Sequence, residues 1–416
     1  MAPLPPVDAA CAGPCPASAI KHVVVVVQEN HTFDDHFGAY CKAAAGSNPS
    51  CNVGPGCCEA APATDPAGTA PTKLDDDTTG ARFPDNSSAC EDLEMNGGKM
   101  DAYSTAACGS PLNVGAADPS LVKPYWDYAA GNAIADRYFQ PVSGASSAND
   151  MYFMRAAYVF ADNSTSPKGA IGQPCGLEGA PQELTGTTLG DLLNAANVPW
   201  TFYAGGYKAM TDAVAAGTCP SAPEACGARL AFYPCNFSPS DYPNEYYAST
   251  RDDPKSMRDL AVLDDDLANG TLPAVAFVKA VGYESEHPGL RNKLSNGIDF
   301  ATGVVQKIFT SRYRADTLIL LTYDEGGGYY DHVAPPSASA VDGKAYGTRV
   351  PMLAIGPFAK KNFVSHIVME HSSVVKLVEW NWLAQKTGQL AGRDAVVNNL
   401  GSLLDPSATG VAVPEQ

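Results

Sequence analysis

Two apolar runs of the sequence each end in oxygen-bearing side chains. Glu29 and Asn30 come just after a run of five valines, and Asp324 and Glu325 come just after the apolar segment TLILLTY. If the two runs are neighbouring strands, three carboxylates meet in a partly desolvated place and repel one another. A divalent cation resolves that conflict, and a shell of oxygen ligands suits Ca, Mg, Mn or Zn. The alternative is a set of helix caps and surface acids.

Glycines and histidines near these acids favour a functional site. Gly326 to Gly328 follow the second acidic pair, and glycine lets a backbone turn sharply or approach a ligand closely. Histidines are scarce, at seven, and six lie within a few residues of an acid or an asparagine. Taken singly, each is more simply a structural residue. Their joint placement favours metal or phosphate chemistry.

A short loop supplies candidate nucleophiles. The segment YFQPVSGASSANDMYFMRA contains Ser143, Ser146, Ser147 and Asn149 among small residues, just before an apolar stretch. Small residues before a helix leave N–H groups free to hold an anion, and a metal-bound hydroxyl there is able to attack phosphorus. Loops rich in serine and glycine are common, so composition alone does not choose among the three serines.

The overall composition limits the class of protein. The chain has 416 residues, of which 45% are hydrophobic and 17% charged, so it is long enough for a large globular core. No apolar run reaches the length of a membrane span. A net charge of −18 argues against nucleic acid as a partner and against attraction to anionic membranes. The charge of an anionic substrate must therefore be met locally, while the oligomeric state is left open.

The cysteines indicate an oxidising compartment. All twelve lie before Ser240, most of them in loops rich in glycine, proline and alanine, and none shows zinc-finger spacing with nearby histidines. We interpret them as disulfides, which places the protein outside the cell or in the periplasm. The alternative is a set of free core thiols. The N-terminus lacks the basic and apolar regions of a signal peptide, which fits a chain that begins after such a peptide was removed.

Alternating strands and helices predict an α/β fold with a mainly parallel sheet. Ligands of such sheets bind beyond the carboxyl ends of the strands, where the acidic pairs lie. We expect an N-terminal arm over 1–20, a single catalytic domain over 21–416, and disulfide-pinned insertions near 42–90 and 207–250. The predicted strands are His22–Asn30, a strand starting near Val198, Leu272–Ala280, Thr317–Thr322 and Val350–Phe358, and the predicted helices include Gly297–Ser311 and His371–Gln385.

Several motifs resemble one known family. QENHTFDDHFG resembles the E-N-x-[ST]-F-D-x-x-[FY]-G signature of the phosphoesterase family that contains bacterial acid phosphatase A and non-specific phospholipase C. TYDEGGGYYDHVAPP is similar to the family's second signature, and YGTRVPMLAIGPF with the following His-Ser helix is similar to its third block. The matches run from about Lys21 to Trp382 in the expected order, so the resemblance covers most of the chain.

The resemblance implies an alkaline-phosphatase-like α/β/α sandwich. It also implies a divalent metal with a further ligand from the nucleophile, which falls at Ser146, while Asn149 falls at the family's asparagine. The implied metal ligands are Glu29, Asn30, Ser146, Asp324 and Glu325. The family's P-N-R stretch is altered here, because Ala148 and Asp150 stand where proline and arginine are usual. A cation that would hold phosphate is therefore missing from this segment.

The resemblance leads to a mechanistic hypothesis. The metal lowers the pKa of the Ser146 hydroxyl, which attacks phosphorus and forms a phosphoserine intermediate. Asn149 and loop N–H groups bind the non-bridging oxygens. His287 protonates the leaving oxygen, and His332 or His371 orients the phosphate or activates the hydrolytic water.

Three functions are compatible with these residues. The first is a secreted phosphomonoesterase of the acid phosphatase type, acting on a phosphorylated small molecule. The second is a phospholipase C that releases phosphorylated headgroups from phospholipids. The acidic chain and the absence of room for a further C-terminal β-domain favour the first. The third is a non-catalytic secreted protein that binds metal or phosphate, which the altered P-N-R stretch allows.

Overall fold

The computed structural model describes most of the chain. Residues 1–13, 82–83, 161–169, 173, 176–182 and 227–232 lie outside the described residues. Most of the predicted N-terminal arm, with Cys11, therefore cannot be compared with its prediction.

The described residues form a central eight-stranded sheet in the order β10-β4-β9-β8-β1-β7-β5-β6. Every neighbouring pair is parallel except for β9, which runs antiparallel to both β8 and β4. The strands are β1 (His22–Gln28), β4 (Ala133–Ala135), β5 (Trp200–Ala204), β6 (Met257–Asp259), β7 (Val275–Lys279), β8 (Thr317–Tyr323), β9 (Met352–Ile355) and β10 (Phe363–Ser365). A separate pair, β2 (Thr72–Leu74) and β3 (Gly115–Ala117), lies beside α1.

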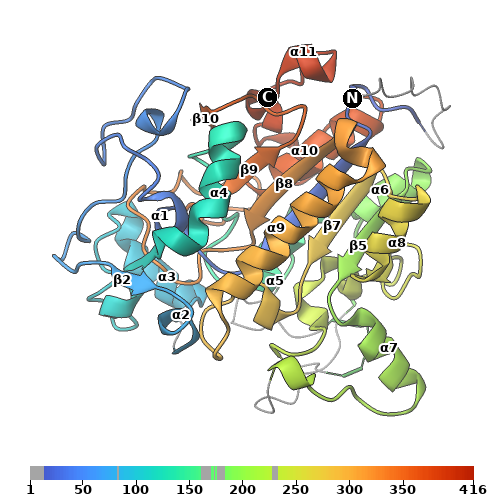
Figure 1. The fold of residues 1–416 in the computed structure, drawn as a ribbon, viewed down its shortest axis with the longest axis horizontal. Coiled ribbons are helices and arrows are strands. Elements are labelled where there is room, and N and C mark those ends of the chain that lie inside the picture. The colour runs from blue at the N-terminus through green and yellow to red at the C-terminus, as the bar shows by residue number, and fades with distance from the viewer. Residues whose placement is uncertain (1–13, 82–83, 161–169, 173, 176–182, 227–232) are drawn as a thin grey trace.

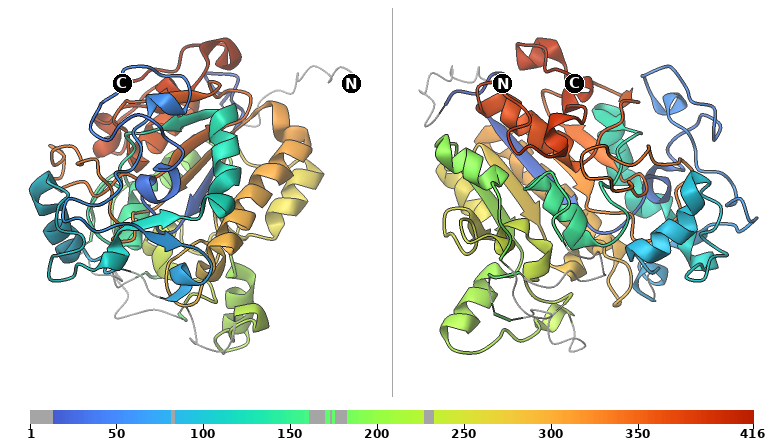
Figure 2. Two further views of the ribbon diagram at one scale, coloured as in Figure 1. Left: turned by 60° about the vertical axis from the view of Figure 1, so that its left-hand side comes forward. Right: turned by 180° about the vertical axis from the view of Figure 1, so that it is seen from behind.

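Helices cover both faces of the sheet (Figures 1 and 2). The long helix α9 packs on β1 and β8, with α4 and α8 beside it, while α10 and α5 lie on the opposite face. The helices are α1 (Phe33–Phe37), α2 (Thr78–Ala81), α3 (Ser88–Met95), α4 (Pro119–Gly131), α5 (Ser146–Asp150), α6 (Leu189–Ala195), α7 (Tyr207–Ala215), α8 (Val262–Asn269), α9 (Leu294–Thr310), α10 (His371–Trp382) and α11 (Pro406–Thr409). The predicted α/β/α class with a mainly parallel sheet is confirmed.

The central strands are apolar without alternation because helices cover both of their faces. All five valines of β1 are fully buried, and all seven residues of β8 are buried. A strand buried on one face only would alternate apolar and polar residues, so the continuous run is the pattern that a doubly covered strand requires.

The structure shifts some of the predicted boundaries. Strand β5 begins at Trp200 and β7 at Val275, each shortly after a proline, Pro199 and Pro273. Proline has no N–H to donate to a sheet ladder, so these strands start later than their apolar runs. Helix α9 begins at Leu294, three residues earlier than the predicted start.

The predicted disulfides are present in both insertions, and no described cysteine is free. The first insertion carries two nested bridges close to α1, and the segment around α7 carries two more. The pairs are Cys41–Cys58, Cys51–Cys57, Cys90–Cys108, Cys175–Cys219 and Cys226–Cys235.

Strand register brings the two acidic pairs together. Strands β1 and β8 are parallel neighbours, and Gln28 at the end of one pairs with Tyr323 at the end of the other. On the other side of β1, Val26 pairs with Val278, the residue before the last one of β7. Residues that follow these positions therefore meet at the carboxyl edge of the sheet, where ligands of parallel sheets bind.

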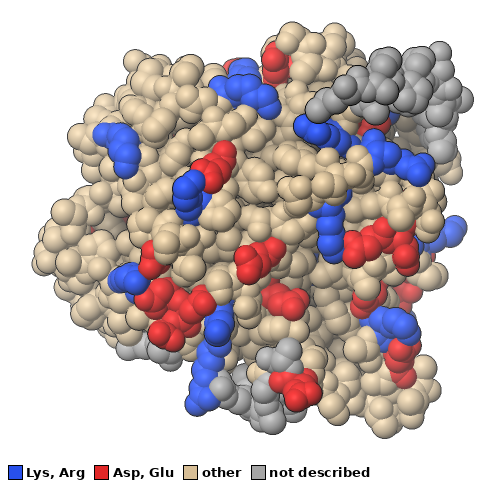
Figure 3. All heavy atoms as spheres, in the orientation of Figure 1, with Lys and Arg blue, Asp and Glu red and all other residues tan. Residues whose placement is uncertain are grey.

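On the face shown in Figure 3, lysines and arginines are interspersed with aspartates and glutamates on a mostly uncharged surface. Within the described part of the chain, no helix combines the length and the apolar character needed to cross a membrane.

Candidate active site

The strand ends of β1 and β8 form the base of the candidate site. The Asn30 side-chain amide donates to Glu325 Oε1, and the Asp324 N–H donates to the Gln28 carbonyl at 3.0 Å. Glu29, Asn30, Asp324 and Glu325 are each at most 2% exposed. Two pairs separated by almost 300 residues thus become one buried cluster, because their strands are neighbours in register.

The glycines after Glu325 are required by close approach to Asn30. Gly327 has a φ of +68°, its N–H donates to Glu325 Oε2, and a Cβ at this position would lie 2.4 Å from the Asn30 carbonyl oxygen. A Cβ on Gly326 would lie 2.2 Å from the Thr348 hydroxyl. The glycine run therefore lets the backbone fold tightly around the acidic pair.

Ser146 is the loop serine that reaches the acidic cluster. It is the first residue of α5, and its hydroxyl donates to Glu325 Oε1 at 3.3 Å while accepting from the Asn30 amide at 3.4 Å. Ser147, the next residue, hydrogen-bonds Tyr246 instead. The position of Ser146 makes it the serine best placed to act as a nucleophile near these oxygens.

Asn149 holds the loop in which Ser146 lies. Its amide nitrogen donates to the carbonyls of Gly144 and Ala145, at 2.8 and 3.2 Å, and its oxygen accepts from the Val142 N–H at 3.0 Å. The sequence predicts that Asn149 binds phosphate oxygens. In this structure the nitrogen and the oxygen of its amide both bond to backbone groups. These bonds position the loop that carries Ser146.

The donor set suits a divalent cation. Burial raises the pKa of Asp324 to about 7, and burial together with the Asp324 charge raises the pKa of Glu325 well above its usual range. The buried Asn30 Oδ1 has no hydrogen-bond partner. Crowded carboxylates and an unpaired carbonyl oxygen are groups that a hard cation stabilises, so Glu29, Asn30, Asp324 and Glu325 are able to hold one, with Ser146 beside it.

A buried lysine also enters this cluster. The Lys279 ammonium, on the last residue of β7, lies 2.8 Å from Glu29 Oε1, 3.2 Å from Asp324 Oδ2 and 2.5 Å from Asp150 Oδ2. The sequence motifs did not predict a role for Lys279. The available signal was a single lysine at the end of an otherwise apolar strand, which is costly to bury unless acids pair with it.

Two further polar residues near the site lie at the end of the first insertion, and the sequence did not predict them. The Asn86 amide donates to Glu325 Oε1 at 2.5 Å, and Glu91 Oε2 accepts from the Gly144 N–H at 2.7 Å. Burial and the nearby Glu325 charge raise the pKa of Glu91 well above its usual range. Neither residue follows a strand, so no pattern in the sequence marks them.

His287 lies close to Glu29. Its Nδ1 is 2.6 Å from the Pro288 carbonyl oxygen, and its ring packs edge-on against Tyr233, whose hydroxyl donates to Glu29. Burial lowers its pKa, with the negative charge of Glu29 acting in the opposite direction. The neutral ring therefore carries its proton on Nδ1 and donates it to the carbonyl.

His371, the first residue of α10, contacts the backbone of the acidic cluster. Its Nε2 lies 2.6 Å from the Asp324 carbonyl oxygen and its Nδ1 lies 3.0 Å from the Tyr138 hydroxyl, while the ring stacks on Phe153. Burial lowers its pKa to about 3. Both ring nitrogens of His371 have partners and the ring stays neutral. These contacts hold the backbone of Asp324 in place.

His332 belongs to a different cluster. Its Nδ1 contacts Asp34 at 2.7 Å and its Nε2 contacts Glu59 at 3.1 Å, and Arg349 binds Asp34 from the other side. Asp34, Asp331 and His332 bring ligand-type atoms within 4.8 Å of one another, but the Arg349 guanidinium already fills the place of a cation. His332 therefore joins this second cluster through Asp34 and Glu59.

Comparison with known proteins identifies the family. The profile described as "Phosphoesterase family" matches residues 20–384. The chain belongs to the phosphoesterase family. It is therefore a hydrolase that acts on ester bonds.

Relatives and solved structures that resemble this chain include the following. The phosphoesterase is 26% identical to phospholipase C A of Mycobacterium tuberculosis, over 94% of this chain and 78% of that protein. It is 24% identical to the non-hemolytic phospholipase C of Pseudomonas aeruginosa, over 92% of this chain and 57% of that protein. Its fold is similar to the lipoteichoic acid synthase LtaP of Listeria monocytogenes, with 11% identity, coverage of 91% and 76%, and a TM-score of 0.43. It is also similar to an alkaline phosphatase superfamily protein of Vibrio parahaemolyticus, with 13% identity, coverage of 92% and 71%, and a TM-score of 0.37.

Proposed function

We propose that this phosphoesterase is a phospholipase C, which releases a phosphorylated headgroup from a phospholipid. The observation that carries the proposal is the approach of the Ser146 hydroxyl to Asn30 and Glu325 at the ends of two paired central strands. From the sequence alone we expected a phosphomonoesterase first and a phospholipase C second. The curated relatives reverse that order, because those matched over most of this chain are named phospholipases C.

The proposed site combines a nucleophile with a cation. Glu29, Asn30, Asp324 and Glu325 would hold a divalent ion, which would supply Lewis-acid stabilisation of negative charge at the reacting oxygens. Ser146 Oγ forms a bond to phosphorus and gives its proton to Glu325 Oε1, the acceptor of its hydrogen bond. The bond from phosphorus to the glycerol oxygen breaks, and that oxygen takes a proton from His287. The product of this step is a phosphoserine that carries the headgroup, and water then releases the phosphorylated headgroup.

Proton transfer falls to His287 in this scheme. A neutral imidazole close to Glu29 suits removal of a proton from the water that hydrolyses the phosphoserine. Protonation of the leaving glycerol oxygen requires the protonated ring, whose population grows as the pH falls. Asn149 and His371 act indirectly, since one fixes the Ser146 loop and the other fixes the Asp324 backbone.

We also propose that the enzyme works in an oxidising compartment, outside the cell or in the periplasm. The support is that no described cysteine is free, because disulfides of this kind persist only where thiols are not kept reduced.

The test compares three substrates with one enzyme. Turnover of p-nitrophenyl phosphocholine, p-nitrophenyl phosphate and phosphatidylcholine vesicles is measured before and after dialysis against a chelator, with Ser146→Ala as the background. Chelator-sensitive cleavage of the phosphocholine diester and the vesicles, with slower turnover of the monoester, is the expected result. Turnover of the monoester alone would overturn the phospholipase proposal and restore the phosphatase.

A further inference from the structure

We propose that Lys279 is an internal cation that competes with the catalytic metal for Glu29 and Asp324 and holds these two residues together when no metal is bound. The proposal rests on the metal site of the proposed function, but it concerns metal binding rather than the substrate. The proposal gives a role to Lys279, which lies outside the signature motifs of the sequence.

The ammonium is saturated by acids. Its three contacts, to Glu29, Asp324 and Asp150, are all 3.2 Å or shorter, and the Lys279 side chain is 1% exposed. An ammonium group has three N–H donors, so three carboxylate oxygens account for all of them. Lys279 is therefore placed to neutralise the acidic cluster, and it has no donor left for a phosphate oxygen.

The same two oxygens are the ones available to a metal. Glu29 Oε2 already accepts from the Tyr233 hydroxyl at 2.7 Å and from the Ser285 hydroxyl at 3.3 Å. Asp324 Oδ1 accepts from the Glu325 N–H at 2.7 Å. Each carboxylate thus has one oxygen bound by neighbouring donors and one oxygen facing the ammonium. A metal that binds Glu29 and Asp324 must share or take over the oxygens that Lys279 holds.

Asp150 offers the ammonium a place to remain after the metal binds. Its Oδ2 contacts Lys279, while its buried Oδ1 has no hydrogen-bond partner. Asp150 also occupies the position at which the family motif has arginine. The acid on α5 is thus paired with the lysine on β7, so the ammonium keeps a partner when a metal takes Glu29 and Asp324.

The first experiment removes the internal cation. Wild type and Lys279→Met are dialysed free of metal, and the binding of Ca²⁺ and Mn²⁺ is measured by competition with a chelating dye alongside thermal unfolding. We expect Lys279→Met to bind at least one of the two ions about tenfold more tightly or better, within the usual range of coupling between sites. The metal-free variant should also unfold at a lower temperature, and metal should restore most of that loss.

Lys376→Met is the matched control. Lys376 is also a buried lysine, but it donates to the Val397 backbone carbonyl at 2.7 Å and contacts no residue of the site. Its loss should lower the unfolding temperature equally with and without metal and leave metal affinity unchanged. This result would separate the loss of a buried lysine from the loss of the internal cation.

A second variant distinguishes two explanations: Lys279 competes with the metal for its ligands, or the Asp150 charge only attracts the metal from a distance. Asp150→Asn removes the alternative partner of the ammonium, so it should weaken metal binding in the wild-type background. In the Lys279→Met background there is no ammonium to retain, and the same change should have little effect. Equal weakening in both backgrounds would overturn the proposal, as would unchanged metal affinity in Lys279→Met. Failure of the phospholipid assay alone would overturn only the proposed function.

Discussion

Two charge clusters among the described residues differ in their balance of acidic and basic groups. The site cluster consists of the Lys279 ammonium, its three acid partners Glu29, Asp150 and Asp324, and the adjoining carboxyl group of Glu325. The arginine cluster consists of four acids and four basic residues, Asp34, Glu59, Asp136 and Asp331 with Arg137, His332, Arg349 and His366.

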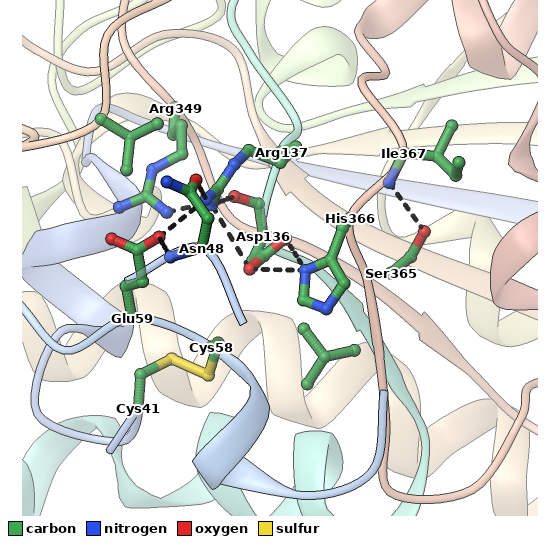
Figure 4. Close-up of polar contacts among 12 residues, drawn as sticks. Cys41, Asn48, Cys58, Glu59, Asp136, Arg137, Arg349, Ser365, His366 and Ile367 are labelled. Atoms are coloured by element: carbon green, nitrogen blue, oxygen red, sulfur yellow. Dashed lines mark hydrogen bonds and ion pairs between the residues drawn. A yellow bond between two sulfur atoms is a disulfide. The ribbon is translucent and has the colours of Figure 1, made fainter. Parts of the chain in front are cut away.

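The arginine cluster is saturated by internal contacts. Figure 4 shows Arg137 between Glu59 and Asp136, with His366 on the other side of Asp136. These contacts fasten the disulfide-bonded segment near Cys58 to residues that follow β4 and β10. Each acid in this network has a basic partner, which offsets the free-energy cost of burying its charge. The network therefore needs no ligand, and we interpret its role as structural.

The site cluster is not saturated. It has more negative than positive charge, and both Asn30 Oδ1 and Asp150 Oδ1 are buried without a partner. Burial raises the pKa of Asp324 to about 7 although the Lys279 charge opposes it. In the arginine cluster, burial also acts to raise the pKa of Asp34, but His332 and Arg349 together lower it. The comparison teaches that buried charge alone does not mark a functional site. Unpaired charge and unpaired acceptors do, because they leave a place for a cation.

The largest expected effect comes from Ser146→Ala. Loss of the nucleophile should lower kcat by at least about 10³-fold while the fold and metal binding remain. Ser147→Ala, one residue away and bonded to Tyr246 instead of the site, should keep most of the activity. Turnover and circular dichroism of both variants provide the measurement, and wild-type turnover in Ser146→Ala would remove Ser146 from the mechanism.

The next effect is on stability and comes from the other cluster. Arg349→Met leaves Asp34 and Asp331 buried without their guanidinium, which should lower the free energy of unfolding by about 3–5 kcal/mol. Added metal should not restore it, in contrast to a change at Lys279. Denaturant unfolding with and without Ca²⁺ measures this, with the exposed Lys208→Met as a control expected to change little. Rescue by metal would show that the two clusters are not distinct.

Asp324→Asn should act on metal binding more than on stability. The substitution removes one charged ligand and one partner of Lys279, so metal affinity should fall about 10- to 100-fold, together with activity. Metal content after dialysis, measured by atomic emission, checks the prediction. Wild-type stoichiometry and affinity would exclude Asp324 from the ligands.

The smallest effect is a pH dependence of stability. Asp136 raises the pKa of His366 against the effect of burial, so the protonated ring stabilises the folded state below pH 6.5, and this contribution is lost as the pH rises through the folded-state pKa. His366→Gln should therefore reduce the fall in stability above pH 6.5. His22→Gln should not, because burial lowers the pKa of His22. Unfolding midpoints from pH 6 to 9 compare the three proteins.

The sequence by itself determined much of this protein. The continuous valine run of β1 and the apolar run of β8 fixed two central strands, because only strands covered on both faces lack alternation. The acids placed after those runs indicated where ligands bind. The cysteines indicated disulfides, and the signature motifs indicated the phosphoesterase family.

Only the tertiary structure decided how charge is distributed between the two clusters. His332 and His287 have similar sequence surroundings, each following an acid, yet one binds Asp34 and Glu59 while the other lies beside Glu29. Lys279 is a single residue within an apolar run, and its partners come from three distant segments. Pairing of this kind depends on strand register and loop packing, which bring together side chains that no local pattern connects.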